Sequence, residues 1–386
     1  MSTIAPSSKS WRQRARFHPI TKLILHPTIT LLSLIILFAL IFFGTLYQAE
    51  HGLYEAQLKF FGYGIVLIGG FFPLPASSLV LWVMSIQLAV TMAVVIPLKW
   101  SKFGLWVVHL GIMTLLIGGF ITQILAVESQ LTLAEGETGN YTTAYHEYEL
   151  AFWEENGDSN QVFAYDDTYL QTGSNLDILP YHSRIKVVTY YQNCDAFTTK
   201  ATGGPKYISS SGIGMLEQRK PEKEVTQNAP GIMFSLTEKD KPSLDILLYG
   251  QENQAMVIPL DGKQVHMMLR LKHYPMNFAL KLTDFIKNVH PGTDIPSSFE
   301  SYADLKENDN SRPVKIWMNN PLRHGGYTFF QASYAQPQGA AEKSTFAVVT
   351  NPGRVMPYVS SLVVFAGLLL HFLIKLIPYV RRETAK

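Results

Sequence analysis

Long stretches without charge alternate along the chain with segments in which charged residues are frequent. Four windows contain no Asp, Glu, Lys or Arg: residues 23–49, 60–98, 103–127 and 355–374. All 32 basic and 30 acidic residues lie outside them. A helix of about 18 or more apolar residues is long enough to cross the hydrocarbon core of a bilayer. The pattern therefore predicts a membrane protein with four transmembrane helices.

The window at 60–98 is too long for one transmembrane helix and does not divide readily into two. Its first part contains several glycines and then Pro73 and Pro75, which break a helix. We expect residues 53–74 to form an interfacial segment on the outer leaflet, with the second transmembrane helix after it. The first three helices and this segment then occupy residues 23–127, and the fourth helix occupies 355–379.

Between the third and fourth helices, over residues 128–354, the apolar period changes from helical to two. Short β-branched or aromatic runs, separated by Gly, Pro, Asn or Asp, predict an antiparallel β-rich domain. A segment rich in Gly, Ser and Lys, residues 198–224, is expected to be a long exposed loop. The expected strands are 148–153, 185–191, 232–236, 244–249, 278–285, 314–318, 327–334 and 346–350.

The distribution of charge predicts the orientation. Basic residues without acids fill the tail at 1–22, recur at Lys99 and Lys102, and dominate the tail at 380–386. By the positive-inside rule these segments are cytoplasmic. We therefore expect a multi-pass protein of the inner (cytoplasmic) membrane with both termini inside and a periplasmic domain. The first window is longer than the apolar part of a signal peptide, which favours an anchor that is not cleaved.

Several absent motifs exclude function classes. The chain has no Gly-x-x-x-x-Gly-Lys-Ser/Thr phosphate loop, no Cys-x-x-Cys-His and no Cys-x-x-Cys, so the sequence indicates neither an ATPase, a c-type cytochrome nor a thioredoxin-like reductant. The short cytoplasmic tails leave no room for a kinase or for nucleic-acid binding. Cys194 is the lone cysteine. It is either an inert thiol or one that acts on a partner's cysteines.

Histidines within the apolar windows are the strongest candidates for chemistry. His109, His371 and His26 all lie toward the cytoplasmic end of a predicted helix. An ionisable side chain in a membrane usually faces a partner or cavity, and imidazole is a common axial ligand of haem iron. The alternative is that each histidine is neutral and bonds a neighbouring carbonyl. His324, in a loop at residues 319–326, is expected to be solvated.

Small residues accompany the histidine of the third window. Gly104, Gly111, Gly118 and Gly119 are expected on nearly the same helix face as His109. Such a stripe lets another helix, or a flat ligand, approach closely. Helix packing explains it without a ligand.

With these features the chain resembles the ResB (CcsB) family, the membrane subunit of System II cytochrome c biogenesis. The resemblance rests on Gly-Thr-Leu-Tyr-Gln at 44–48, His-Leu-Gly at 109–111 and Gly-Gly at 118–119. It is most specific in Asn-Pro-Leu at 320–322, Gly-Tyr-Thr-Phe-Phe-Gln-Ala-Ser-Tyr at 326–334 and Asn-Pro-Gly at 351–353.

The resemblance implies a subunit that works with a CcsA/ResC-type membrane partner. The pair is understood to carry haem b as cargo and to attach it to the Cys-x-x-Cys-His of apocytochrome c. His109 matches the family's haem ligand, so any metal contact is through haem iron, whereas His371 matches no family residue. The partner's tryptophan-rich haem loop is not in this chain, which implies a subunit of a haem lyase that is inactive alone, with no catalytic residue of its own.

The sequence leaves two further functions open. One is a non-catalytic assembly or scaffold subunit whose histidines merely pack. The other is an extracytoplasmic sensor that needs a membrane partner.

If the chain handles haem, basic residues at the inner surface would pair with the haem propionates. These residues are Arg16, Lys22, Lys99 and Lys102.

Overall fold

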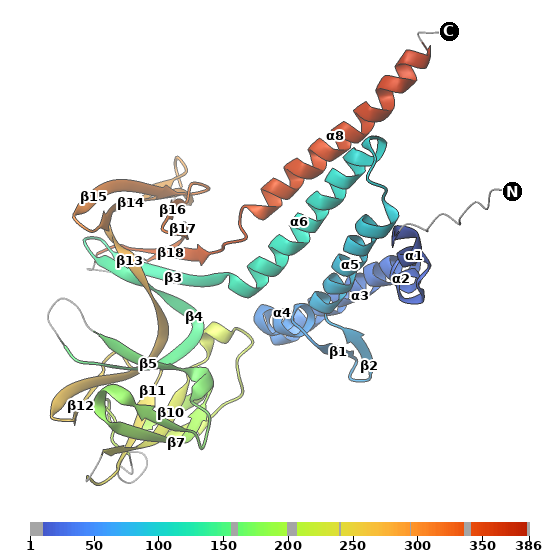
Figure 1. Cartoon of the computed structure of the whole chain (residues 1–386). Helices are drawn as coiled ribbons and strands as arrows, with labels where there is room; N and C mark the ends of the chain where they lie inside the picture. The colour runs from blue at the N-terminus through green and yellow to red at the C-terminus, as the bar shows by residue number, and fades with distance from the viewer. Residues whose placement is uncertain are drawn as a thin grey trace. The chain divides into compact units, whose positions relative to one another are not determined.

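The computed structural model describes residues 11–155, 161–198, 207–238, 241–293, 295–335 and 341–383. The chain divides into two compact units, one formed by Met1–Ala126 with Asn351–Lys386 and the other by Val127–Thr350. The first unit is helical apart from one hairpin, and the second is built mainly from strands (Figure 1).

Four helices in the described part of the chain are long and apolar enough to cross a membrane: Pro27–His51, Ser77–Val95, Trp100–Leu125 and Met356–Val380. They confirm the four apolar helices expected from the uncharged windows. The helices of this unit are α1 (Trp11–Phe17), α2 (Pro19–Ile24), α3 (Pro27–His51), α4 (Leu53–Phe61), α5 (Ser77–Val90), α6 (Phe103–Leu125) and α8 (Met356–Glu383).

The segment expected to be interfacial, residues 53–74, contains α4 and most of a two-stranded hairpin, β1 (Ile65–Ile68) and β2 (Phe72–Pro75). The turn uses Gly69 and Gly70, both with positive φ, which glycine adopts without a steric penalty. Proline is tolerated in β2 because each strand of such a hairpin is an edge strand. The small core of α3, α4, hairpin and α5 consists of Leu40, Phe60, Val66, Ala76 and Val80.

A buried glutamine links α5 to the start of α3. Gln87 is 8% exposed, and its amide nitrogen donates to the carbonyl of His26 at 3.2 Å. Its amide oxygen accepts from the hydroxyl of Thr30 at 2.7 Å. A buried polar side chain needs such partners. After this point α5 passes into a π-helical turn, Thr91–Val95.

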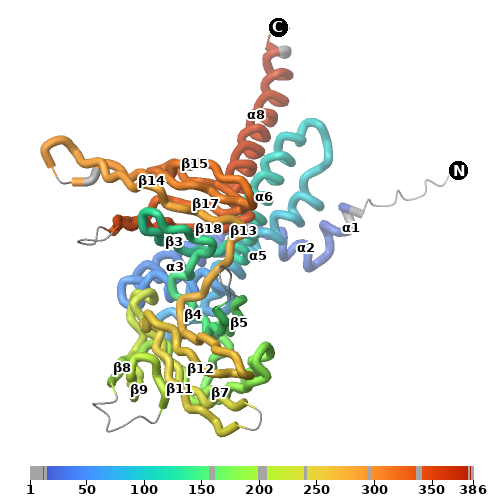
Figure 2. Tube along the Cα trace, turned by 90° about the vertical axis from the view of Figure 1, so that its left-hand side faces the viewer, coloured from blue at the N-terminus to red at the C-terminus, as the bar shows by residue number. Residues whose placement is uncertain are grey.

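The β-rich unit contains a large sheet and smaller ones, with neighbouring strands of each sheet antiparallel (Figure 2). In the described residues the large sheet has the order β15-β14-β13-β4-β3-β18-β17-β16, with β12 on β13 and β5 on β4. A second sheet has the order β11-β10-β7-β6, and β8 pairs with β9. The strands are β3 (Val127–Ala134), β4 (Thr138–Trp153), β5 (Val162–Asp166), β6 (Asn175–Ile178), β7 (Ser183–Tyr191), β8 (Cys194–Thr198), β9 (Ile213–Gln218), β10 (Gly231–Glu238), β11 (Leu244–Tyr249), β12 (Met256–Leu260), β13 (Lys263–Val289), β14 (Pro296–Glu307), β15 (Asn310–Trp317), β16 (Leu322–His324), β17 (Tyr327–Ala335) and β18 (Lys343–Thr350).

Strand β13 runs through both main cores of this unit. Residues 265, 267 and 269 enter the first core, and residues 276, 278, 280 and 282 enter the second. Alternation in a strand has a period of two, so a change from odd to even positions requires an irregularity. The pairing register with β4 shifts after Leu271 and again after Pro275. These shifts turn the inward face over between the two cores.

The eight expected strands are confirmed, each lying within an observed strand to within one residue. The exposed loop expected at 198–224 is wrong in part, because β9 lies inside it and pairs with β8. Ile213 and Leu216 of β9 are buried, so packing stabilises this strand despite its weak alternation. Residues 199–206 of the expected loop lie outside the described residues.

His324 is also less exposed than expected. It ends the short strand β16, which pairs with β17 across the turn at Gly325 and Gly326. Its side chain is 21% exposed, and its Nε2 lies 3.3 Å from a carboxylate oxygen of Glu307. The ring packs edge-on against Phe278, with centroids 4.8 Å apart. His324 therefore packs on the second core.

Candidate functional site

The histidine of α6 has one ring nitrogen occupied and one available. The Nδ1 of His109 lies 2.7 Å from the carbonyl oxygen of Leu105, one turn earlier in the helix. A carbonyl only accepts, so Nδ1 carries the proton and donates. The Nε2 then presents a lone pair. A histidine that binds a metal is commonly held in this way by a backbone carbonyl.

A tryptophan that the sequence reasoning missed lies on the same face of α6. Trp106 precedes His109 by three residues, which is about 60° around the helix. Its indole Nε1 is buried and has no hydrogen-bond partner among the described residues, although a buried indole N–H usually finds one. The i, i+3 spacing was the available signal. An unpartnered donor and a free acceptor thus lie side by side on this helix.

The face that carries Trp106 and His109 continues into an apolar groove between α5 and α6. The groove has a volume of about 490 Å³, and Met113, one turn after His109, lines it. At its far end Trp82 of α5 stacks on Phe120 of α6, with ring centroids 4.4 Å apart. Apart from Ser85, the rest of the lining is apolar and includes Ile86, Ala89 and Ile117.

The glycine stripe faces the opposite way, which corrects the expectation that it shares the face of His109. At 100° per residue, Gly104, Gly111 and Gly118 lie about 140° to 180° away from His109. A Cβ added at Gly111 would meet the Cγ2 of Val364 on α8 at 2.6 Å. Gly119 has nothing within 4 Å of such a Cβ. The stripe therefore holds α8 against α6.

The structure does not bring His371 and His109 together. His371 lies on the face of α8 that packs on α6, with its backbone against Gly104. Gly104 precedes His109 by five residues, about 7.5 Å along the helix, and lies on its far side. The Nδ1 of His371 is buried without a hydrogen-bond partner in the described part of the chain. The two imidazoles therefore do not face one ligand from within this unit.

His26 has a structural role at the start of α3. It is the N-cap residue, and its Nδ1 accepts from the backbone N–H of Thr28 at 3.3 Å. An N-cap side chain satisfies one of the free donors in the first helical turn. This contact uses one of its two ring nitrogens.

A buried ion pair lies in the β-rich unit where β4 pairs with β13. Arg270 contacts Glu149 at 2.8 Å, and these side chains are 16% and 7% exposed. Burial raises the pKa of Glu149, and the charge of Arg270 opposes that rise. His273 stacks on Tyr141 with centroids 4.1 Å apart. Burial, and to a smaller extent the charge of Arg270, lowers the pKa of His273 to about 4.

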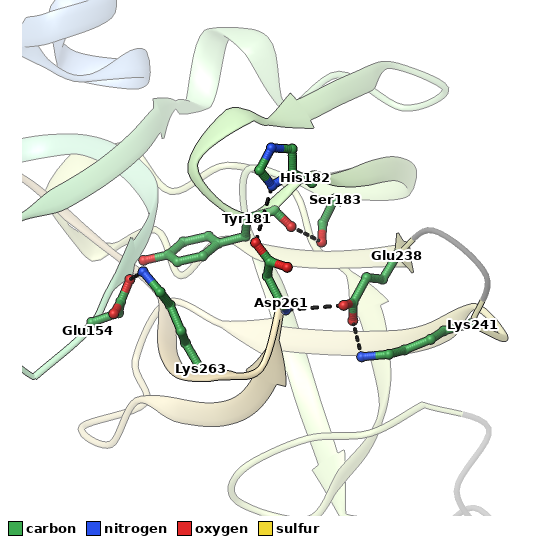
Figure 3. Close-up of polar contacts among 8 residues, drawn as sticks. All are labelled: Glu154, Tyr181, His182, Ser183, Glu238, Lys241, Asp261 and Lys263. Atoms are coloured by element: carbon green, nitrogen blue, oxygen red, sulfur yellow. Dashed lines mark hydrogen bonds and ion pairs between the residues drawn. The ribbon is translucent and has the colours of Figure 1, made fainter.

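Other polar clusters of this unit are internally paired. In the cluster of Figure 3, Asp261 accepts from His182 at 3.2 Å, and its backbone N–H donates to Glu238 at 3.1 Å. Lys241 contacts Glu238 at 2.7 Å, and Lys263 contacts Glu154 at 2.9 Å (Figure 3). Within the described residues no group of three or more His, Cys, Asp or Glu side chains is placed to hold a metal ion.

Cys194 is packed into a core and is not presented to a partner. It is 1% exposed, and its Sγ lies 3.5 Å from the carbonyl oxygen of Ala229. Burial raises the pKa of the thiol to about 12. Because the thiolate is the reactive form of cysteine, the structure favours the inert thiol over the reactive one.

Four apolar helices and a large β-rich unit fit a membrane protein, and comparisons with known proteins found two similarities. The model of the ResB-like family matches residues 244–343. The chain is 24% identical over 269 residues to Protein NrfI of Wolinella succinogenes. That match covers 69% of this chain and 27% of NrfI, so the chain spans about a quarter of that relative's length. These matches confirm the resemblance to the ResB family.

Proposed function

We propose that the chain is a membrane subunit of cytochrome c biogenesis that holds haem, its cargo, through the Nε2 of His109. One observation carries the proposal: Nδ1 is committed to the Leu105 carbonyl at 2.7 Å, which leaves Nε2 as a free acceptor. Neutral imidazole with a protonated, hydrogen-bonded second nitrogen is the form that ligates iron. The ResB-like match, over residues 244–343, supports a role in cytochrome c biogenesis, and the ligand role of His109 rests on its geometry.

The surroundings of His109 suit a flat apolar cargo. The groove that begins one turn after it is lined by apolar side chains of α5 and α6. Such a surface takes up the faces of a macrocycle, because burying apolar area is favourable. The basic residues before α6, Lys99 and Lys102, would pair with the propionates at the inner surface.

The second axial ligand would come from a partner. His371 lies on the opposite side of α6, against Gly104, so it is not placed to complete the coordination begun by His109. We therefore propose a CcsA/ResC-type membrane protein as the source of the second imidazole, with apocytochrome c as the acceptor of the haem. On this proposal the chain is not an active haem lyase by itself.

The proposal includes a membrane orientation. Both termini would be cytoplasmic and the β-rich unit periplasmic, in the inner membrane of a bacterium. The basic segments at the ends of the chain support this orientation through the positive-inside rule. The four apolar helices supply an even number of crossings.

The test is the absorption spectrum of the complex purified with its CcsA/ResC-type partner. We expect a bis-imidazole haem spectrum that is lost in His109→Gly and regained when free imidazole is added. The matched control is His371→Ala, which removes another imidazole of the same helical unit and should keep the spectrum.

Two results would contradict the proposal. An unchanged spectrum in His109→Gly would place the haem on other ligands. An intact complex that carries no haem would favour the scaffold function, in which the histidines only pack.

A further inference from the structure

A cavity in the β-rich unit lies at the turn that joins β15 to β16. Its volume is about 410 Å³. The turn is held by the backbone N–H of Asn320, which donates to the carbonyl of Trp317 at 2.9 Å, and Asn319 adopts a left-handed conformation with φ 61°. The cavity is lined chiefly by Arg312, Lys315, Trp317, Asn319, Asn320 and Arg323.

The polar lining of this cavity is made of hydrogen-bond donors and neutral amides. No acidic side chain lines it in the part of the chain that the structure describes. Lys315 is held at the cavity wall by Glu300 at 2.8 Å, with its ammonium 5.0 Å from the centroid of the Trp317 ring. A cavity with cationic donors and no acid favours an anionic ligand.

The two arginines of the cavity differ from the other arginines of this unit. Arg184, Arg219 and Arg270 each contact a carboxylate within 3.2 Å. Neither Arg312 nor Arg323 has a carboxylate partner among the described residues. Residues 128–354 hold 27 acidic against 20 basic residues, so partners are not scarce. Among the described residues, the two arginines of this unit without a carboxylate partner line the same cavity.

The backbone that carries these arginines is firmly placed. Arg312 lies opposite Leu305 in the pairing of β15 with β14, and Arg323 lies opposite Thr328 in the pairing of β16 with β17. Near the arginines in the same strands, Val314 packs against the second core and Leu322 belongs to it. The backbones that carry the two arginines are therefore anchored in the sheet, which lowers the cost of ordering this site on binding.

We propose that this cavity binds the two carboxylates of a flat dianionic ligand, the propionates of the porphyrin cargo, at a different stage from the one in which Lys99 and Lys102 would pair with them. The inference rests on the proposed function, which supplies the porphyrin. Each guanidinium offers a planar pair of donors that matches one carboxylate. Trp317 and the two prolines beside the arginines, Pro313 and Pro321, add apolar surface for the edge of the ring. This site lies in the β-rich unit and uses no group of α6.

Protoporphyrin IX, which has no iron, tests this site independently of His109. Its fluorescence anisotropy is titrated with the full chain in detergent micelles, as wild type and as Arg312→Gln/Arg323→Gln. The matched control is Arg184→Gln, which removes an exposed arginine elsewhere in the same unit. The porphyrin dimethyl ester, which lacks the carboxylates, is the second probe.

The double variant should bind protoporphyrin at least about tenfold more weakly than wild type, since two charge-assisted contacts are lost. It should bind the dimethyl ester as wild type does, and Arg184→Gln should bind protoporphyrin normally. Equal protoporphyrin affinity of the double variant and wild type would overturn the inference. An equal loss of affinity for protoporphyrin and for its dimethyl ester would also overturn the inference, because the arginines would then not be recognising the carboxylates.

A competition arm separates carboxylate from phosphate chemistry. Glutarate should displace protoporphyrin at a lower concentration than inorganic phosphate. The reverse order would assign the cavity to a phosphate and overturn the inference. Loss of haem ligation in His109→Gly is a separate measurement, so failure of the cavity and failure of the proposed function give different results.

Discussion

The backbone of His371 lies so close to Gly104 that a Cβ on Gly104 would be 2.4 Å from the nitrogen of His371. Helix α8 therefore meets α6 backbone to backbone at the level of this histidine. Small residues permit such close approach, which strengthens packing between apolar helices. The same contact separates His371 from His109, because it fixes His371 on the other side of α6.

Substituting a glycine of this contact should loosen the helix pair. In Gly104→Ala the methyl group has no space, and overpacking of this kind lowers the free energy of unfolding by about 1–3 kcal/mol. We expect a lower Tm for the chain in detergent. The matched control is Gly119→Ala, where a Cβ has nothing within 4 Å. Equal Tm values for the two variants would contradict the packing role of Gly104.

The buried ion pair between β4 and β13 should be sensitive to the loss of one partner. Arg270→Gln leaves the carboxylate of Glu149 buried without its cation, which destabilises by about 3–5 kcal/mol. The double variant Arg270→Leu/Glu149→Leu should lose less, since no charge is left unpaired. Denaturant unfolding followed by tryptophan fluorescence measures both. A double variant less stable than the single one would argue against this account.

The single variant should also depend on pH in a particular direction. Burial raises the pKa of Glu149, and the charge of Arg270 opposes that rise. Losing Arg270 therefore raises the pKa of Glu149 further. A carboxyl whose pKa is higher in the folded state retains stability at low pH and loses it as pH rises. Arg270→Gln should therefore be less destabilised at pH 5 than at pH 8. Measuring the free energies of unfolding of the variant and of wild type at these two pH values tests this prediction.

The pKa of His273 predicts the opposite pH dependence: the free energy of unfolding should fall as the pH is lowered. Its pKa is about 4 in the folded protein against 6.5 for free histidine, so the unfolded chain takes up a proton first as pH falls. Stability present above pH 6.5 should be lost progressively toward pH 4, by at most about 3 kcal/mol. Unfolding curves at pH 7 and pH 5 should therefore show a larger loss in wild type than in His273→Gln. Parallel losses would mean that other groups cause the effect.

Cys194 should be unreactive in the folded chain. With 1% of the residue exposed and a pKa of about 12, it offers almost no thiolate at pH 7. We expect negligible reaction with a disulfide reagent such as DTNB under native conditions and one equivalent after unfolding in guanidinium. Rapid labelling of the native chain would revive the reactive-thiol alternative.

Local pattern was sufficient for most of the elements. Uncharged windows predicted α3, α5, α6 and α8 because a helix of that length in a membrane must be apolar throughout. Alternation predicted strands such as β7 and β10, whose inward residues are buried. It missed β9, where Ile213 and Leu216 alone mark the buried face.

The opposition of His109 and the glycine stripe needed only the 100° step of a helix, so it was within reach of the sequence. Which helices pack against these two faces could not be predicted from the sequence. That α8 covers Gly104 and that α5 borders the groove beyond Met113 depend on contacts between segments distant in the chain. The unpaired state of Arg312 and Arg323 likewise depends on where every nearby carboxylate lies.

By itself the sequence determined the apolar helices, the β-rich character of residues 128–354 and the identity of His109 as a candidate ligand, because each follows from composition or local spacing. Only the tertiary structure decided that the backbone of His371 packs against Gly104 and that two arginines line one cavity. These properties depend on hydrogen bonds, close contacts and strand registers, which are fixed when distant parts of the chain pack together.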